Sequence, residues 1–276
     1  MRVGIVTPVL TLLPGAHGRW ERDAGIEEVA RIAETADRLG YDHMTCSEHV
    51  AVPASVALAR GATYWDPLAT LGFVAARTSR LRLATGVLVL GYHHPLEIAK
   101  RYGTLDRVSG GRLILGVGVG SLEEEFALLG APFADRGARA DFALGLIRSS
   151  MSSREPAAYP SFIVDPCAVQ ERVPIWVGGR TRRSLRRAVE LADGWMPFGL
   201  SAGALADMLA RVDLPAGFEA VLAADRALDP MADRPRVEDT VGELAAAGAT
   251  ILSARIFARS LDHYLEQLES LASVAP

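Results

Sequence analysis

Strand-forming apolar runs alternate with segments whose apolar residues recur every three or four positions, along the whole chain. The alternation begins with "RVGIVTP" and a segment at 25–40, in which Val29, Ile32 and Ala36 share one helical face. This pattern is typical of parallel βαβ units. We therefore expect a parallel sheet covered by helices.

Local signals indicate where several of these helices begin and end. Gly40 follows the first helical segment and is placed to end it, because glycine adopts the left-handed conformation of a C-cap. Asp66 and Pro67 open the next helix in the preferred order of N-cap and first turn. Gly110 and Gly111 end the third.

The alternation yields eight predicted strands, each followed by a helical segment. The expected strands cover residues 2–8, 41–49, 81–90, 112–120, 173–179, 194–199, 217–224 and 249–257. The expected helices cover residues 25–40, 66–79, 94–111, 121–130 with 140–151, 181–194, 201–212, 236–248 and 260–272. This count favours an α/β fold, a (β/α)8 TIM barrel, as one domain over residues 1–276. A doubly wound open sheet is the alternative, since a strand count does not show closure.

Composition limits the classes of function. Half of the residues are hydrophobic and the formal charge is -4, so we expect a globular chain with no nucleic-acid partner. Only Cys46 and Cys167 are present, without metal-ligand spacing. No apolar stretch approaches the 18 or so residues needed to span a bilayer. We expect a cytoplasmic protein with no membrane partner.

Candidate chemistry follows the second and third strands, at the barrel end where such folds carry their active sites. Glu48 and His49 are suited to general acid or base work, although a solvated loop pair is the alternative. "GYHHP" follows the third strand and places Tyr92, His93 and His94 where they can line a pocket. His94 can simply start the next helix. No third ligand accompanies the two histidines, so no metal is expected.

Two glycines and an arginine after the fifth strand, Gly178, Gly179 and Arg180, form a predicted anion site. Backbone amides, a helix N-terminus and a guanidinium together suit a phosphate group. The alternative is a plain turn before a basic helix face. The arginines expected on that solvated face are Arg183, Arg186 and Arg187.

The stretch "GVGVGS" at 116–121 is not a dinucleotide fingerprint. A Rossmann motif needs glycine at its sixth position, and Ser121 stands there. The motif also follows three complete βα units rather than opening the fold. Its glycines are expected to let a flat ring approach the barrel mouth, with a tight turn as the alternative.

Three segments together resemble the luciferase-like monooxygenase superfamily, and in particular its branch of oxidoreductases that use the deazaflavin coenzyme F420. They are "SEH", the stretch from Leu83 to Gly130 and the stretch from Pro174 to Trp195. The resemblance implies a closed barrel, a homodimer, and a flat ring at the carboxyl ends of the strands. It implies hydride transfer to or from a small organic substrate. FMN-dependent oxygen activation and a non-catalytic flavin-binding protein remain alternatives.

The resemblance also implies residue roles. His49 would act as proton donor or charge stabiliser, and Glu48 would hold its imidazole. A non-prolyl cis peptide is expected at Gly86–Val87, behind the cofactor ring. The implied cofactor-binding residues are Gly86, Val87, Gly118, Gly120, Gly178, Gly179 and Arg180.

Two departures from the family limit what carries over. Ser121 stands where sugar-phosphate dehydrogenases of the family have a catalytic Glu, which argues against that reaction. The irregular excursion at 152–173, before the fifth strand, is short. A reduced substrate cover and a more open pocket are therefore expected.

Overall fold

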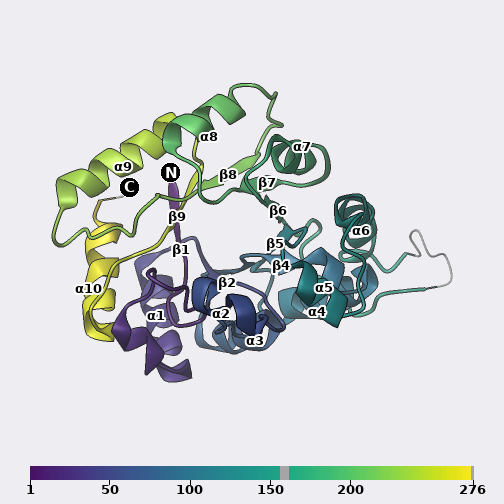
Figure 1. Cartoon of the computed structure of the whole chain (residues 1–276), viewed down its shortest axis with the longest axis horizontal. Coiled ribbons are helices and arrows are strands. Elements are labelled where there is room, and N and C mark those ends of the chain that lie inside the picture. The colour runs from purple at the N-terminus through teal and green to yellow at the C-terminus, as the bar shows by residue number, and fades with distance from the viewer. Residues whose placement is uncertain (156–161, 275–276) are drawn as a thin grey trace.

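The computed structural model describes residues 1–155 and 162–274, and its core is a closed parallel β-barrel (Figure 1). The strands are β1 (Arg2–Ile5), β2 (His43–Cys46), β3 (Arg82–Thr85), β4 (Leu88–Val89), β5 (Leu113–Gly118), β6 (Ile175–Gly178), β7 (Gly194–Met196), β8 (Glu219–Leu222) and β9 (Ile251–Ala254). Every pairing is parallel, in the order β3-β2-β1-β9-β8-β7-β6-β5-β4.

The pairing of β3 with β5 closes the barrel. Leu83 lies opposite Leu113 and Ala84 opposite Ile114, so the sheet has no free edge there. The predicted strand at 81–90 is divided into β3 and β4 by a cis peptide bond at Gly86–Val87, the non-prolyl cis bond that the sequence led us to expect. The fold is thus the predicted (β/α)8 barrel with eight strand positions, and the open doubly wound sheet is excluded.

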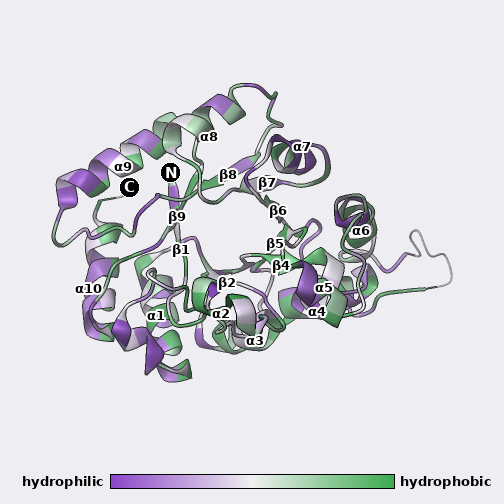
Figure 2. Ribbon diagram, viewed as in Figure 1, coloured by the Kyte–Doolittle hydropathy of each residue, from purple (hydrophilic) through white to green (hydrophobic). Residues whose placement is uncertain are grey.

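Helices surround the barrel. They are α1 (Ile26–Leu39), α2 (Ala54–Arg60), α3 (Pro67–Arg77), α4 (Pro95–Val108), α5 (Glu123–Leu128), α6 (Arg136–Ser150), α7 (Arg182–Leu191), α8 (Ala202–Leu209), α9 (Arg234–Ala246) and α10 (Leu261–Ala272), with 3-10 turns η1 (Arg19–Arg22) and η2 (Leu90–Tyr92). Figure 2 shows apolar residues concentrated along the strands, while α7 and α9 carry long hydrophilic stretches. No helix in the described part of the chain is long and apolar enough to cross a bilayer.

The predicted helix signals act as expected. Gly40 ends α1 with φ +80°, and the Asp66 side chain accepts a hydrogen bond from the backbone of Ala69 to cap α3. His94 caps α4, which confirms its reading as a helix-start residue. Within the excursion, residues 152–155 and 162–173 contain no helix or strand, as predicted, and 156–161 lie outside the described residues.

The amino-terminal end of the barrel is filled by charged and polar side chains that we call the barrel-floor network: Arg2, Asp42, His43, Arg82, Trp176 and Glu219. Asp42 accepts from Arg82 at 2.6 and 2.7 Å and from Arg2 at 3.1 Å, and its Oδ2 lies 2.8 Å from the Nδ1 of His43. Glu219 accepts from the Trp176 indole at 2.6 Å. Burial alone would raise the pKa of Asp42, but His43 and Arg82 outweigh it and hold the pKa well below 3.8.

Replacing Asp42 with Asn is expected to lower the free energy of unfolding at pH 7 by about 1.5–3 kcal/mol, because charge-assisted hydrogen bonds are lost. A carboxyl whose pKa is lowered in the folded state stabilises that state at pH values above its unfolded pKa, near 3.8. This stabilisation is lost as the pH falls through the pKa of the folded state. The deficit should therefore shrink below about pH 4. Urea unfolding at several pH values measures this. Asp262→Asn, at an exposed ion pair with Arg31, is the control and should cost less than about 1 kcal/mol.

Candidate functional site

The first part of the candidate site is a backbone bulge between β3 and β4. The Ser47 hydroxyl donates to the carbonyl of Gly86 at 2.8 Å, and the Glu48 amide donates to that of Val87 at 3.2 Å. The Glu48 carboxylate in turn accepts from the amide of Val89 at 2.7 Å. The segment after β2 therefore holds both sides of the cis peptide, and Glu48 acts as a clamp on the bulge.

The second oxygen of Glu48 is also engaged. It lies 2.6 Å from the Nε2 of His93, in the loop that leads into α4. This hydrogen bond raises the pKa of His93 above its ordinary value of 6.5, although burial acts in the opposite direction. Both oxygens of this buried carboxylate are thus used to join the loops after β2 and β3.

A different carboxylate holds His49. Glu125, on α5, is buried, and its Oε2 lies 2.6 Å from the Nδ1 of His49 and accepts from the Tyr92 hydroxyl at 2.6 Å. Its Oε1 accepts from the amides of Val50 at 2.6 Å and Ala51 at 3.1 Å. Because Nδ1 faces a carboxylate, it carries the proton. Nε2 is then the ring nitrogen available to a reactant, and no described residue hydrogen-bonds it.

The electrostatics of this cluster favour a negative charge on Glu125. Burial acts to raise the pKa of Glu125, but hydrogen bonds from Tyr92, His49 and Ala51 outweigh it and lower the pKa below 4.5. Burial and the bond to Glu125 raise the pKa of Tyr92, so its phenol stays protonated. The ionised Glu125 carboxylate therefore faces the Nδ1 of His49. The His49 side chain is 17% exposed, and the centre of the Tyr64 ring lies 4.5 Å from the centre of the imidazole, with the two rings nearly perpendicular.

The sequence-based role of Glu48 as the residue that holds His49 is therefore wrong. The Glu48 side chain turns toward the bulge, while the His49 side chain turns toward α5. Sequence reasoning missed Glu125 because it is the third of three consecutive glutamates. The available signal was spacing: Leu122 and Phe126 are buried, and Glu125 lies on the same helical face.

The strand-end glycines make room for the protein's own side chains. A Cβ on Gly118 would lie 2.7 Å from Val87, and one on Gly178 would also lie 2.7 Å from Val87. Gly120 has φ +77°, and its Cβ would lie 2.5 Å from Phe126. Val87 thus fits between the ends of β5 and β6 and stays partly exposed there. Such an apolar surface fits a flat ring, and the direct contact of these glycines with a cofactor stays a prediction.

The predicted anion site lies where β6 leads into α7. Gly179 has φ +120°, and the Thr181 and Ser184 side chains each accept from the other's amide at the start of the helix. The two amides between Thr181 and Ser184 have no intrahelical acceptor, as at the start of any helix. Arg180 is exposed, with its guanidinium carbon 5.9 Å from the centre of the Phe198 ring. This geometry fits an anionic group.

The basic face of α7 differs from the prediction at one position. Arg183 and Arg186 are exposed, but Arg187 is buried, pairs with Asp141 and donates to the carbonyl of Gly137 at 2.9 Å. Arg187 therefore fastens α7 to α6 and does not belong to the solvated face.

Residue 121, at the mouth of the barrel, is a serine and carries no acid group. The Ser121 hydroxyl accepts from Arg60 at 3.3 Å, and both groups are exposed. Among residues 1–155 and 162–274, no group of three or more histidine, cysteine, aspartate or glutamate side chains is arranged to hold a metal ion.

The closed barrel and the acid–base cluster at its carboxyl end define an α/β-barrel protein with the site architecture of an enzyme. The chain belongs to the luciferase-like monooxygenase family, whose model matches residues 1–216. An uncharacterized protein of Mycobacterium tuberculosis is 31% identical over 199 residues, covering 66% of this chain and 68% of that protein. The 4-hydroxyprotoasukamycin monooxygenase of Streptomyces nodosus subsp. asukaensis is 37% identical over 125 residues, covering 45% of this chain and 32% of that protein.

Solved structures share the fold over nearly the whole chain. The monooxygenase RslO1 from Streptomyces bottropensis has a TM-score of 0.74 at 21% identity, covering 99% of this chain and 98% of its own. The coenzyme F420-dependent tetrahydromethanopterin reductase of Methanopyrus kandleri has a TM-score of 0.71 at 16% identity, and the match covers 100% of this chain and 99% of that one. The oxygenating constituent of 3,6-diketocamphane monooxygenase from Pseudomonas putida, in complex with FMN, has a TM-score of 0.74 at 16% identity. The match covers 100% of this chain and 98% of that one. Enzymes of this fold thus use either cofactor.

Proposed function

We propose that the protein is an oxidoreductase that uses reduced coenzyme F420 for hydride transfer with a small organic substrate. The observation that carries the proposal is the His49 imidazole, held by Glu125 at 2.6 Å, at the same barrel end as the partly exposed Val87 bulge. A bound deazaflavin would supply the hydride. The chain's own task is then to place a proton beside the reacting atoms and to exclude water.

The residues divide this task between them. Val87 offers an apolar surface against which a flat ring fits, and Glu48 fixes the bulge that carries it. The Nε2 of His49 would give a proton to the substrate or take one from it, while Glu125 stabilises the charged imidazole. Gly178, Gly179 and Arg180 would hold an anionic group of the cofactor. A homodimer is part of the same proposal.

An FMN-dependent monooxygenase is the second candidate. It is favoured by the curated relative at 37% identity, which is named as a monooxygenase, and by the FMN-bound structure that shares the fold. The same bulge and anion site would serve FMN, because both cofactors combine a flat tricyclic ring with a phosphate group. The difference between the two candidates therefore rests on cofactor preference.

Separate titrations with coenzyme F420 and FMN, followed by fluorescence quenching, test the choice. We expect saturable binding of coenzyme F420 that is tighter than that of FMN. Arg180→Gln should weaken it by about tenfold, since a charge-assisted hydrogen bond contributes about 1.5–3 kcal/mol. Arg186→Gln, on the exposed side of α7, is the matched control and should bind like the parent. Tight binding of FMN alone would reverse the order of the two candidates.

A further inference from the structure

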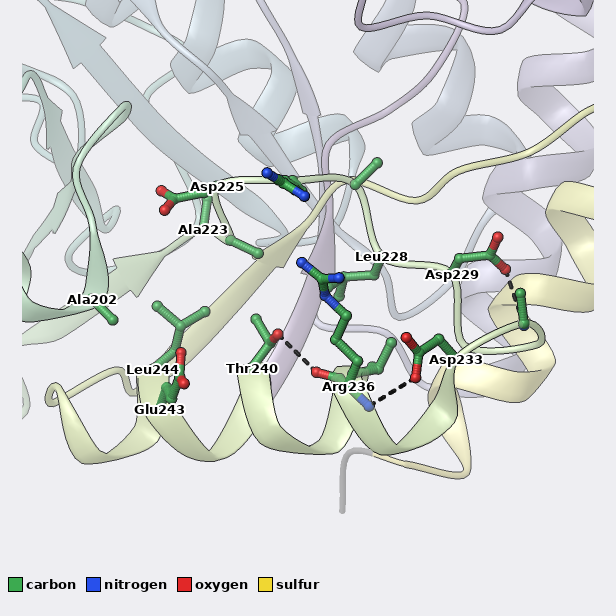
Figure 3. Close-up of a pocket in the computed structure, with 15 residues that line it drawn as sticks. Ala202, Ala223, Asp225, Leu228, Asp229, Asp233, Arg236, Thr240, Glu243 and Leu244 are labelled. Atoms are coloured by element: carbon green, nitrogen blue, oxygen red, sulfur yellow. Dashed lines mark hydrogen bonds between the residues drawn. The ribbon is translucent and has the colours of Figure 1, made fainter.

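A cavity of about 510 Å³ lies outside the barrel, between α9, the start of α8 and the loop at 223–233 that follows β8 (Figure 3). None of the residues of the candidate active site lines it. Its volume falls in the range of small-molecule sites, about 300–1,000 Å³. The cavity is therefore large enough for a ligand of its own.

Helix α9 lines one side of this cavity with apolar and small side chains. Val237 and Leu244 are buried, and the smaller Thr240 lies between them on the same helical face. Leu228, from the loop after β8, is buried as well. These residues give the cavity an apolar floor.

Arg236 brings a positive charge into this cavity without a direct ion-pair partner among the described residues. Its guanidinium makes no hydrogen bond or ion pair with any described residue, and Figure 3 shows the side chain extending from α9 toward the loop beside Leu228. Arg234, two positions earlier, differs: it pairs with Glu238 at 2.8 Å and donates to Ser273. An extended arginine without a carboxylate partner is suited to an anion.

The neighbouring aspartates do not pair directly with the Arg236 guanidinium. Asp233 accepts from the backbone amide of Arg236 at 3.2 Å, which caps α9. Asp229 accepts from the amide of Ala232 at 3.2 Å and from the Gln267 side chain at 2.5 Å. Both aspartates are thus engaged with amides in building the loop and the helix start, and the guanidinium is left for a ligand.

We propose that this cavity binds a small organic anion with an apolar body. Its carboxylate or phosphate would contact Arg236, and its hydrocarbon part would cover Leu228, Val237 and Leu244. Two further carboxylates at the rim, Asp225 and Glu243, have no side-chain partner in the described residues and would repel additional negative charge. The site is independent of the proposed oxidoreductase function, since the two share no residue.

Titration calorimetry with octanoate, octyl phosphate and octylammonium tests the proposal. We expect one molecule of octanoate or of octyl phosphate to bind per chain. The ligand with the higher affinity shows whether the site prefers a carboxylate or a phosphate. Arg236→Gln should weaken binding by at least about tenfold, because the charge-assisted contact is lost. Arg234→Gln is the matched control on the same helix, and His49→Ala reports on the barrel mouth. Both should bind like the parent.

Four results would overturn the proposal. They are the absence of binding by both anions, equal affinity of Arg236→Gln and Arg234→Gln, octylammonium binding as tightly as octanoate, and loss of binding in His49→Ala. The last result would place the anion at the barrel mouth instead. Because the titration contains no redox cofactor, failure of the proposed oxidoreductase activity would leave this experiment unchanged.

Discussion

Replacing His49 with alanine is expected to lower turnover by about 10²–10⁴-fold, the usual contribution of a general acid or base. The affinity for the cofactor should stay nearly the same, because the bulge and the anion site do not depend on the imidazole. Stopped-flow turnover and cofactor titration of the same preparation separate the two effects. His263→Ala, in the first turn of α10, is the control. Unchanged turnover of His49→Ala would contradict the assignment.

Glu125→Gln sharpens this test, because Glu125 positions His49 without contacting a reactant. The amide can still accept from Val50 and Ala51, but it removes the negative charge beside Nδ1. Turnover should fall while the cofactor affinity holds. The double variant with His49→Ala should be no slower than His49→Ala alone, since residues that act as a unit are not additive. Additive losses would show that Glu125 serves only the loop.

The fold could be predicted from the sequence because its signals are local and repeated. Gly40 and Asp66 acted as helix caps, and the alternation of strands and helices gave the order of the barrel. Closure could not be derived in the same way, because it depends on the first strand, β1, pairing with the last, β9, which lies far away in the sequence. The short helix α2 has no buried residue, so it leaves no apolar pattern to detect.

The candidate site was predictable only at the level of strand ends. Residues after β2, β3, β5 and β6 do gather at one end of the barrel, as parallel strands require. Their pairing was not predictable, because Glu48 and His49 are neighbours in sequence yet turn to different partners. Glu125 becomes part of the site only through the way α5 packs against the loop after β2.

Gly116→Ala is expected to be among the most damaging single changes, costing about 3–5 kcal/mol of unfolding free energy, at or above the upper end for overpacking. Its Cβ would lie 1.9 Å from the carbonyl oxygen of Thr85, which is backbone of β3 and cannot move aside without disturbing the bulge that follows. At about 2–4 °C per kcal/mol, the melting temperature should fall by about 6 °C or more. Gly145→Ala, within α6 and with open space around its Cβ, should instead stabilise by about 0.5–1 kcal/mol. Calorimetry of the two variants decides the point: if Gly116→Ala melts at the same temperature as the parent, Gly116 does not serve the protein's own packing.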